Sequence, residues 1–422
     1  MNRTEIAPGV FVNQIAGQKF KRCKISIHLV VPGSRENATE LALLPHLLDR
    51  SCAAIPDPLR LSRRLFDLYG AEIASESYTA GANRVLTIGI SGLKNAYALQ
   101  GEDLESEYLT LACQLLFAPK LQNGVFNAAE VEIEKEKQAD YLRSEMNDKR
   151  MYCLHQARRS LFKNSPMGIE SSGYLEDIEA ITAQSLFATY HALLATAQIE
   201  AFVVGANAEK AAQILQNAMV AIKRSPAQQA KPVAIQPPAN FEYFEKPMDT
   251  VQGKLCIMCT SGSVATPRQM AIMRVATAIF GGLPTSRLFV NVREKQSLCY
   301  YCAASYAGQS GVLTIDSGVD HASRERAAKA VLHELTQMQT QLVSEQELQN
   351  ATDALTNAFT GVTDNPDALE NWAFNERLRG TDLSIEDFLA LLQNVTREEI
   401  RTAMASFTPA VQYAITGKEE AK

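Results

Sequence analysis

Two widely separated stretches of the chain begin with the same order of apolar and polar positions. The first reads KISIHLVVPGS over 24–34 and leads into ENATELALLPHLLDRSC, which has helical spacing. The second reads KLCIMCTSGS over 254–263 and leads into TPRQMAIMRVATAIFGG, which opens with a Thr-Pro pair typical of a helix start. Nearly continuous short apolar runs predict buried strands. Each half is therefore expected to begin with a strand followed by a helix.

The likeness between the halves continues downstream. SRRLFDLYG begins at position 62 and SRLFVNVRE at position 286, and each leads into two alternating segments joined by a glycine-containing turn, which predict paired strands. Long helical stretches over 127–161 and 324–359 follow, and late strands over 199–205 and 411–416 close the halves. This shared order predicts an α+β protein with two homologous domains, each a mixed or antiparallel sheet with helices on one face.

A composition change divides the two halves. Residues 225–247 contain five prolines in a mostly polar stretch that cannot sustain a helix or a strand ladder. We expect an N-terminal domain over 1–224, a linker over 225–247 and a C-terminal domain over 248–422.

Composition and charge narrow the class of protein. The 422 residues are 46% hydrophobic and 21% charged, which excludes a mostly disordered or fibrous chain. The net charge of -6, with both signs interspersed, makes nucleic acid an unexpected partner. No apolar run has the roughly 18 residues that a membrane-spanning helix needs, and the first residues do not resemble a secretory signal. A cytoplasmic protein without a membrane partner is expected, with its eight cysteines as free thiols.

Candidate chemistry first arises in the first helical stretch, where His46 and Asp49 are three residues apart and Arg50 follows. A zinc hydrolase needs about three nitrogen or oxygen ligands and a carboxylate that handles the proton of the bound water. Arg50 would be a fixed cation beside the metal, and at about 4 Å and an effective dielectric of about 20 the repulsion is about 8 kcal/mol. The residues themselves therefore argue against zinc here, and a solvated Asp49 and Arg50 beside a packed His46 is the alternative.

The HLLDR segment, the internal duplication and the segment FGGLPTSRLFVNVREKQSLCY together resemble the pitrilysin and insulinase family of zinc peptidases over essentially the whole chain. Active members carry His-x-x-Glu-His, with two zinc ligands and a glutamate general base. The resemblance matches His46 to the first ligand, but Asp49 replaces the base and Arg50 replaces the second ligand. It implies a zinc motif broken at two of three positions.

The resemblance also places a third ligand, a glutamate, on a later charged helix that matches EVEIEKEKQADYLRSEMNDKR over 130–150. This register puts Leu142 or Arg143 at the glutamate position, with Glu145 nearby on a different face. The resemblance therefore implies no metal and no cofactor in this chain, and no catalytic residue of its own.

The second half retains more of the family pattern. Arg293 and Tyr300 match the family residues that contact the substrate backbone and the tetrahedral intermediate, and both side chains can donate hydrogen bonds to an oxyanion. Gly281 and Gly282 match the glycine-containing turn that precedes this element. A salt-bridged arginine and a packed tyrosine remain the structural alternative to peptide binding.

The resemblance is to non-catalytic members, such as inactive bacterial processing-peptidase-like subunits. It implies that the chain binds peptide by strand addition and completes the chamber of a zinc-bearing paralogous partner, as a heterodimer or by self-association. The alternative is a binding or scaffold protein without a peptidase role, a setting the resemblance links to modification of translation elongation factor P. A further alternative is a metalloprotein with an unrecognised zinc site, for which His155 and His191 are available.

Two Cys-x-x-Cys pairs, Cys256 with Cys259 and Cys299 with Cys302, also raise the possibility of a four-cysteine zinc site. Their 39-residue separation exceeds the usual range of about 15–20 residues. Both pairs fall in expected strands, where residues three apart point to opposite faces. Packed free thiols are the favoured interpretation.

Overall fold

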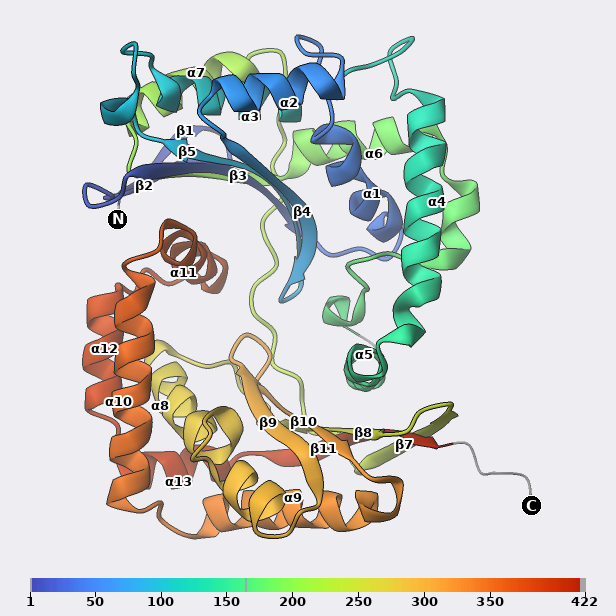
Figure 1. The fold of residues 1–422 in the computed structure, drawn as a ribbon, viewed down its shortest axis with the longest axis vertical. Helices are drawn as coiled ribbons and strands as arrows, with labels where there is room; N and C mark the ends of the chain where they lie inside the picture. The colour runs from blue at the N-terminus through green and yellow to red at the C-terminus, as the bar shows by residue number, and fades with distance from the viewer. Residues whose placement is uncertain (1, 164, 418–422) are drawn as a thin grey trace. The chain divides into compact units, whose positions relative to one another are not determined.

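The computed structural model describes residues 2–163 and 165–417, which divide into two compact units. Unit 1 contains the described residues up to Arg143, with Ile169–Lys231 and Asp364–Phe374. Unit 2 contains Ser144–Gly168, Pro232–Thr363 and the described residues from Asn375 onward. Each unit has one mixed sheet with helices, as the α+β duplication predicts (Figure 1).

The sheet of unit 1 has six strands in the order β1-β2-β6-β3-β5-β4. Strand β2 pairs with β6 in parallel, and the other neighbours pair antiparallel. Strand β4 forms one edge of the sheet. The strands are β1 (Asn2–Ala7), β2 (Val10–Ile15), β3 (Arg22–Pro32), β4 (Glu72–Ala80), β5 (Asn83–Leu93) and β6 (Gln198–Val204).

Helices cover one face of this sheet, where alternate residues of β3, including Ile25, Ile27 and Leu29, join the apolar core. Leu43 and Leu44 of α1 pack into the same core, because the period-2 pattern of the strand and the apolar face of the helix meet there. The helices are α1 (Ala38–Leu48), α2 (Pro58–Asp67), α3 (Leu104–Phe117), α4 (Ala128–Ser144), α6 (Ala183–Thr196) and α7 (Ala208–Met219), with short 3-10 turns η1 (Asn95–Tyr97) and η4 (Leu175–Ala180).

The sheet of unit 2 has five strands in the order β7-β11-β8-β10-β9. Strand β7 pairs with β11 in parallel, the remaining pairs are antiparallel, and β9 forms an edge. The strands are β7 (Glu242–Met248), β8 (Gly253–Thr260), β9 (Cys299–Ala307), β10 (Val312–Val319) and β11 (Thr408–Gly417).

The helices of unit 2 pack mainly against one face of its sheet and against one another. The elements are α5 (Lys149–Leu161), α8 (Pro267–Thr277), α9 (Arg324–Thr340), α10 (Glu345–Val362), α12 (Ile385–Gln393) and α13 (Arg397–Ala405), with the short helices η2 (Glu145–Asn147), η3 (Pro166–Gly168), η5 (Ala278–Gly282), η6 (Leu288–Glu294) and η7 (His321–Ser323).

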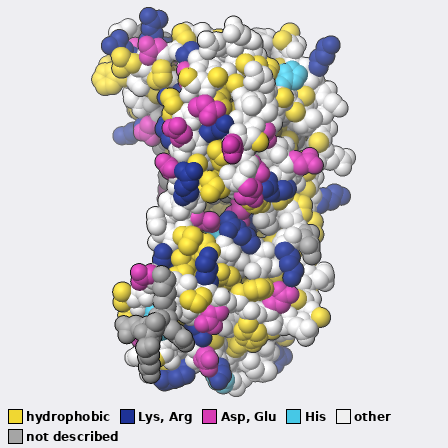
Figure 2. All heavy atoms as spheres, turned by 90° about the vertical axis from the view of Figure 1, so that its right-hand side faces the viewer, with side chains coloured by type: hydrophobic (Ala, Val, Ile, Leu, Met, Phe, Trp, Pro, Cys, Tyr) yellow, Lys and Arg dark blue, Asp and Glu magenta, His cyan; other side chains and the backbone are white. Residues whose placement is uncertain are grey.

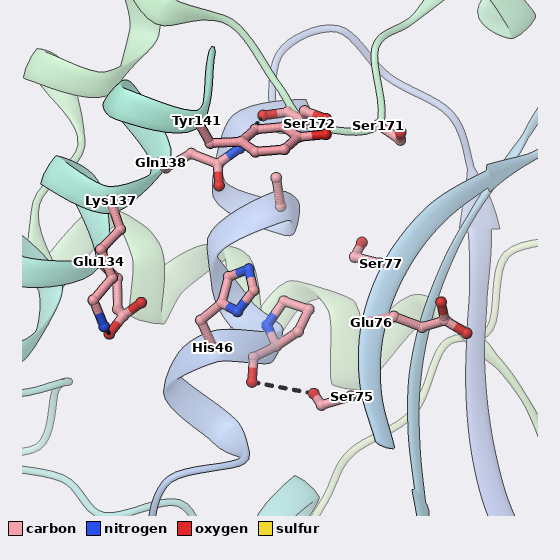
Figure 3. A pocket seen from close by; sticks show the side chains of 12 residues that line it. His46, Ser75, Glu76, Ser77, Glu134, Lys137, Gln138, Tyr141, Ser171 and Ser172 are labelled. Carbon is pink, nitrogen blue, oxygen red and sulfur yellow. Dashed lines mark hydrogen bonds and ion pairs between the residues drawn. The ribbon is translucent and has the colours of Figure 1, made fainter. Parts of the chain in front are cut away.

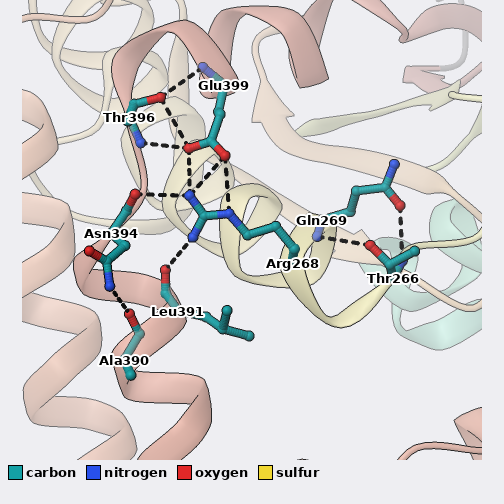
Figure 4. Close-up of polar contacts among 8 residues, drawn as sticks. All are labelled: Thr266, Arg268, Gln269, Ala390, Leu391, Asn394, Thr396 and Glu399. Carbon is teal, nitrogen blue, oxygen red and sulfur yellow. Dashed lines mark hydrogen bonds and ion pairs between the residues drawn. The ribbon is translucent and has the colours of Figure 1, made fainter.

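Arg268 of α8 ties three of these helices together (Figure 4). Its guanidinium donates to the Glu399 carboxylate of α13 at 2.6–3.0 Å and to the carbonyl oxygens of Leu391 and Asn394 at 2.8 Å. The guanidinium thus satisfies C-terminal carbonyls of α12 while it pairs with a carboxylate, a use suited to its five fixed donors.

Each long helical stretch expected from the sequence is interrupted. The stretch over 127–161 breaks after Ser144, and Asp148 caps α5 by accepting from the backbone N–H groups of Arg150 and Met151. The stretch over 324–359 breaks after Thr340, where Ser344 and Glu347 form a capping box at the start of α10.

The first break has a large consequence, because α5 packs in unit 2 against β8 and β11 although it precedes the linker. Conversely, Asp364–Phe374, which includes most of α11 (Pro366–Arg379), belongs to unit 1. Each unit is thus completed by a segment from the other half of the sequence.

Two surface properties follow from the described residues. On the face shown in Figure 2, Lys and Arg side chains are interspersed with Asp and Glu, without a large region of one sign. No described helix combines the length and apolar content needed to cross a bilayer.

Candidate functional site

A pocket of about 500 Å³ opens in unit 1 between α1, α4 and the edge strand β4 (Figure 3). His46 projects into it from α1, with Ser75 and Ser77 on the strand side. The remaining lining residues are Ala42, Pro45, Glu76, Glu134, Lys137, Gln138, Tyr141, Ser171 and Ser172. Of the three motif residues, His46 lines the pocket, whereas Asp49 and Arg50 do not, and Arg50 contacts the lining residue Glu134.

The end of α1 presents the motif residues in sequence. The helix ends at Leu48, so Asp49 is its C-cap and Arg50 lies beyond it. The carbonyl oxygen of Pro45 accepts from the Asp49 N–H and from the Ser75 hydroxyl, both at 3.1 Å. Burial raises the pKa of Asp49, and the nearby His46 and Arg50 only partly oppose this shift.

The charge at the centre of the site is balanced within the chain. Glu134 of α4 is buried, and its Oε1 accepts from Arg50 Nη1 at 2.5 Å and from Lys137 Nζ at 2.9 Å. A carboxylate that would otherwise be an expensive buried anion is thus paired with two cations.

These residues do not fit a zinc ion. His46 is the one imidazole that lines the pocket, Arg50 is a permanent cation, and Glu134 Oε1 is already engaged by two basic groups. A zinc site needs three or four neutral or anionic ligands that converge on one point. Arg50 instead supplies the positive charge that a metal would bring.

The face of α4 that lines the pocket carries Glu134, Gln138 and Tyr141, spaced by four and three residues. Arg143 lies off this face, with its side chain 62% exposed and paired with Asp140 at 2.9 Å. Arg143, which was expected at the third-ligand position, therefore lies outside the pocket, and Tyr141 is the last residue of α4 among those that line it.

His155 and His191, the other histidines considered as zinc ligands, do not line the pocket. His155 lies on α5 in unit 2, where its Nδ1 is 2.7 Å from Glu145 Oε1. This hydrogen bond, together with Arg159, lowers the pKa of Glu145 despite partial burial. His191 lies exposed on α6 beside the Phe187 ring, with their centroids 6.4 Å apart.

Comparisons with known proteins agree with this geometry. A family model described as the peptidase M16 inactive domain matches residues 180–355. The chain is 26% identical over 414 residues to the "Probable inactive metalloprotease YmfF" of Bacillus subtilis, covering 98% of this chain and 97% of that protein. The chain is therefore similar to proteins of the peptidase M16 (insulinase-like) family. It is a homologue of inactive M16 metalloproteases, in line with the broken motif at His46, Asp49 and Arg50.

Solved M16-like structures share the fold over the whole chain. A conserved protein from Enterococcus faecalis superposes with a TM-score of 0.92 at 25% identity, covering 100% of this chain and 99% of that one. A peptidase M16 inactive domain from Pseudomonas fluorescens gives a TM-score of 0.82 at 19% identity, with the same coverage.

In unit 2, Arg293 and Tyr300 lie on the neighbouring elements η6 and β9. Arg293 of η6 places its guanidinium 4.4 Å from the centre of the Phe289 ring. Tyr300 of the edge strand β9 is 54% exposed, and its hydroxyl donates to Asp320 Oδ1 at 2.7 Å. This hydrogen bond raises the pKa of Tyr300. The two side chains are therefore held by local contacts and are accessible from the sheet edge.

Gly281 allows η5 to approach β9 closely. A Cβ atom at this position would lie 2.8 Å from both the backbone nitrogen and the Cβ of Ala304. We expect Gly281→Ala to lower the free energy of unfolding by about 1–3 kcal/mol, because the contact involves backbone that cannot move aside. Chemical denaturation measures this loss.

Gly361 provides the matched control for that substitution. It lies on α10 with no atom within 4 Å of an added Cβ, so Gly361→Ala is expected to be neutral or to stabilise by up to about 1 kcal/mol. Equal effects of the two substitutions would contradict the proposed steric role of Gly281.

The cysteines do not form a four-cysteine centre. All eight are free thiols, and Cys256 and Cys259 point to opposite faces of β8, as strand alternation predicts. The same expectation is wrong for Cys299 and Cys302, because a bulge in β9 changes the alternation between them.

Proposed function

We propose that this chain is the non-catalytic subunit of an M16 peptidase assembly, which binds extended peptide and completes the chamber of a zinc-bearing paralogous partner. The observation that carries the proposal is the ion pair between Arg50, which replaces a ligand of the zinc motif, and Glu134, which lines the pocket beside His46. A chain with an internal cation at this point retains the fold and the pocket but supplies no metal-bound water.

The pocket supports peptide binding through its strand side. Strand β4 pairs with β5 along one edge, and the other edge carries no partner among the described strands. Ser75 and Ser77 line the pocket from this strand. An extended peptide could add to the free edge through main-chain hydrogen bonds, and the pocket would then receive alternate side chains.

Arg293 and Tyr300 offer a second set of contacts. Arg293 has guanidinium donors for a peptide carbonyl, and Tyr300 at the edge of the unit 2 sheet would donate to one by exchanging its hydrogen bond to Asp320. In the proposed assembly these groups bind and orient peptide, while the partner provides the metal chemistry.

The test uses the purified chain alone and together with a zinc-bearing M16 paralogue from the same source. The chain alone is expected to show no chelator-sensitive cleavage, whereas adding it should raise the turnover by the paralogue. We expect Arg293→Ala with Tyr300→Phe to reduce this stimulation by about 10- to 100-fold, since loss of the hydrogen bond from the charged Arg293 alone costs about 1.5–3 kcal/mol.

Matched controls separate peptide binding from surface effects. Arg326 on α9 and Tyr243 on β7 are both exposed, so Arg326→Ala with Tyr243→Phe should leave the stimulation unchanged. If the Arg293 and Tyr300 variant changes assembly but not turnover, the scaffold function is favoured instead. Chelator-sensitive proteolysis by the chain alone would rule out the proposed non-catalytic role.

A further inference from the structure

A β-bulge brings two cysteines of unit 2 to the same face of the sheet. Cys302 lies opposite Ser317 on β10, and Cys299 lies opposite Val319, two residues further along. Three steps along β9 therefore correspond to two steps along β10, with Tyr300 as the additional residue. Because Ser317 and Val319 share a face, Cys299 and Cys302 share it too.

The strand register places both thiols near Ser317. Cys302 lies directly opposite Ser317, and Cys299 lies opposite the next residue on the same face of β10. Ser317 is itself buried and donates to the Tyr301 carbonyl oxygen at 2.9 Å, which fixes its position. Cys302 is buried, whereas Cys299 is partly exposed, so a small ion can reach the pair from the Cys299 side.

The geometry suits an atom between the sulfurs better than a bond joining them. Same-face positions two residues apart along a strand have Cα atoms about 6.6 Å apart and nearly parallel Cβ directions. A disulfide needs Cβ atoms about 3.5–4.5 Å apart. A bridging metal ion removes this requirement.

The donor set selects the kind of ion. Among the described residues, no third Cys, His, Asp or Glu side chain joins these two thiols in a ligand cluster. Zn²⁺ prefers four ligands, whereas thiolates favour soft Cu(I), which can accept two donors. A bis-thiolate Cu(I) unit has one net negative charge, and η6, which packs against β9, carries the cation Arg293.

We propose that Cys299 and Cys302 form a two-coordinate thiolate site for a soft monovalent cation of the Cu(I) type. On binding, each thiol that is still protonated releases its proton to solvent, and no electron transfer is required. Tyr300 has no partner residue in the register of β9 with β10. The resulting bulge makes the site possible, because it brings Cys299 and Cys302 to the same face.

The test is an anaerobic Cu(I) competition titration of the reduced full-length chain against a chromophoric Cu(I) chelator. We expect one Cu(I) per chain. Cys299→Ser and Cys302→Ser should each weaken Cu(I) binding by more than about 100-fold. Loss of a residue that only hydrogen-bonds a metal ligand costs roughly 10- to 100-fold, and these substitutions remove a ligand itself. Cys256→Ser is the matched control, since Cys256 lies buried on the opposite face of the sheet.

If Cys302→Ser at the buried position prevents folding, the partly exposed Cys299 still provides a test. Cys299→Ser alters the more accessible thiol and can be interpreted alone, with circular dichroism confirming the fold. Binding that persists in Cys299→Ser, or a preference for Zn²⁺ over Cu(I) at the same pair, would overturn the proposal.

Discussion

Glu370→Ala is expected to lower the free energy of unfolding by about 3–5 kcal/mol, because it leaves buried polar groups without their partner. Glu370 is 3% exposed in unit 1, where the Asp364–Phe374 segment meets β3. Its Oε1 accepts from the Ser26 hydroxyl and lies 2.9 Å from His28 Nε2, and its Oε2 is 3.2 Å from Lys24 Nζ.

The surroundings of His28 explain why the loss should be large. His28 Nδ1 is 2.8 Å from the Thr87 hydroxyl, and its ring stacks on Phe374 with centroids 4.1 Å apart. His28 and Ser26 are both buried, so water cannot readily replace the missing carboxylate. Chemical denaturation followed by circular dichroism measures the effect.

Asp367 offers a matched control on the same helix. It also pairs with Lys24, at 2.6 Å, but its side chain is 67% exposed. Asp367→Ala should therefore cost less than about 1 kcal/mol. A similarly small loss for Glu370→Ala would show that the buried network does not hold this segment in place.

The same carboxylate predicts a pH dependence. Burial alone would raise the pKa of Glu370, but the His28 hydrogen bond and the charges of His28 and Lys24 outweigh it and lower the pKa from 4.5. A carboxyl with a lowered folded-state pKa stabilises the fold above its unfolded pKa, and this contribution is lost as the pH falls through the folded value. Below about pH 4.5, wild-type stability should fall more steeply than that of Glu370→Gln.

Arg50→Met should destabilise unit 1 by about 1.5–3 kcal/mol, because buried Glu134 would retain only the exposed Lys137 as a partner. Adding Glu134→Leu should recover much of the loss, since replacing both members of a buried pair by apolar groups is often close to neutral. The measurement is a double-mutant cycle of unfolding free energies. Strictly additive losses would contradict the idea that Arg50 balances the charge of Glu134.

The sequence predicts those parts of the fold and of the site that depend on residues close together in the chain. The buried strands, the following helices and the proximity of His46, Asp49 and Arg50 all follow from short-range patterns. The position of Tyr141 depends on the register of α4 against α1, which an error of one or two residues changes completely. Sequence matching selected Leu142 or Arg143 for that reason.

Contacts between residues that are far apart in the sequence leave no such short-range pattern. The polar residues Lys24, Ser26 and His28 alternate with core residues along β3, but nothing nearby in sequence identifies Glu370 as their partner. Likewise, the bulge at Tyr300 depends on pairing with β10, so simple alternation assigned the thiols of Cys299 and Cys302 to opposite faces.

The most direct test of the account is the zinc content per chain after expression with zinc and removal of loosely bound ion. The arrangement of His46, Arg50 and Glu134 predicts a value near zero, because Glu134 beside the pocket is paired with the cation Arg50. One tightly bound zinc per chain that is lost on His46→Ala would contradict the central claim that this chain has no zinc centre at its degenerate motif.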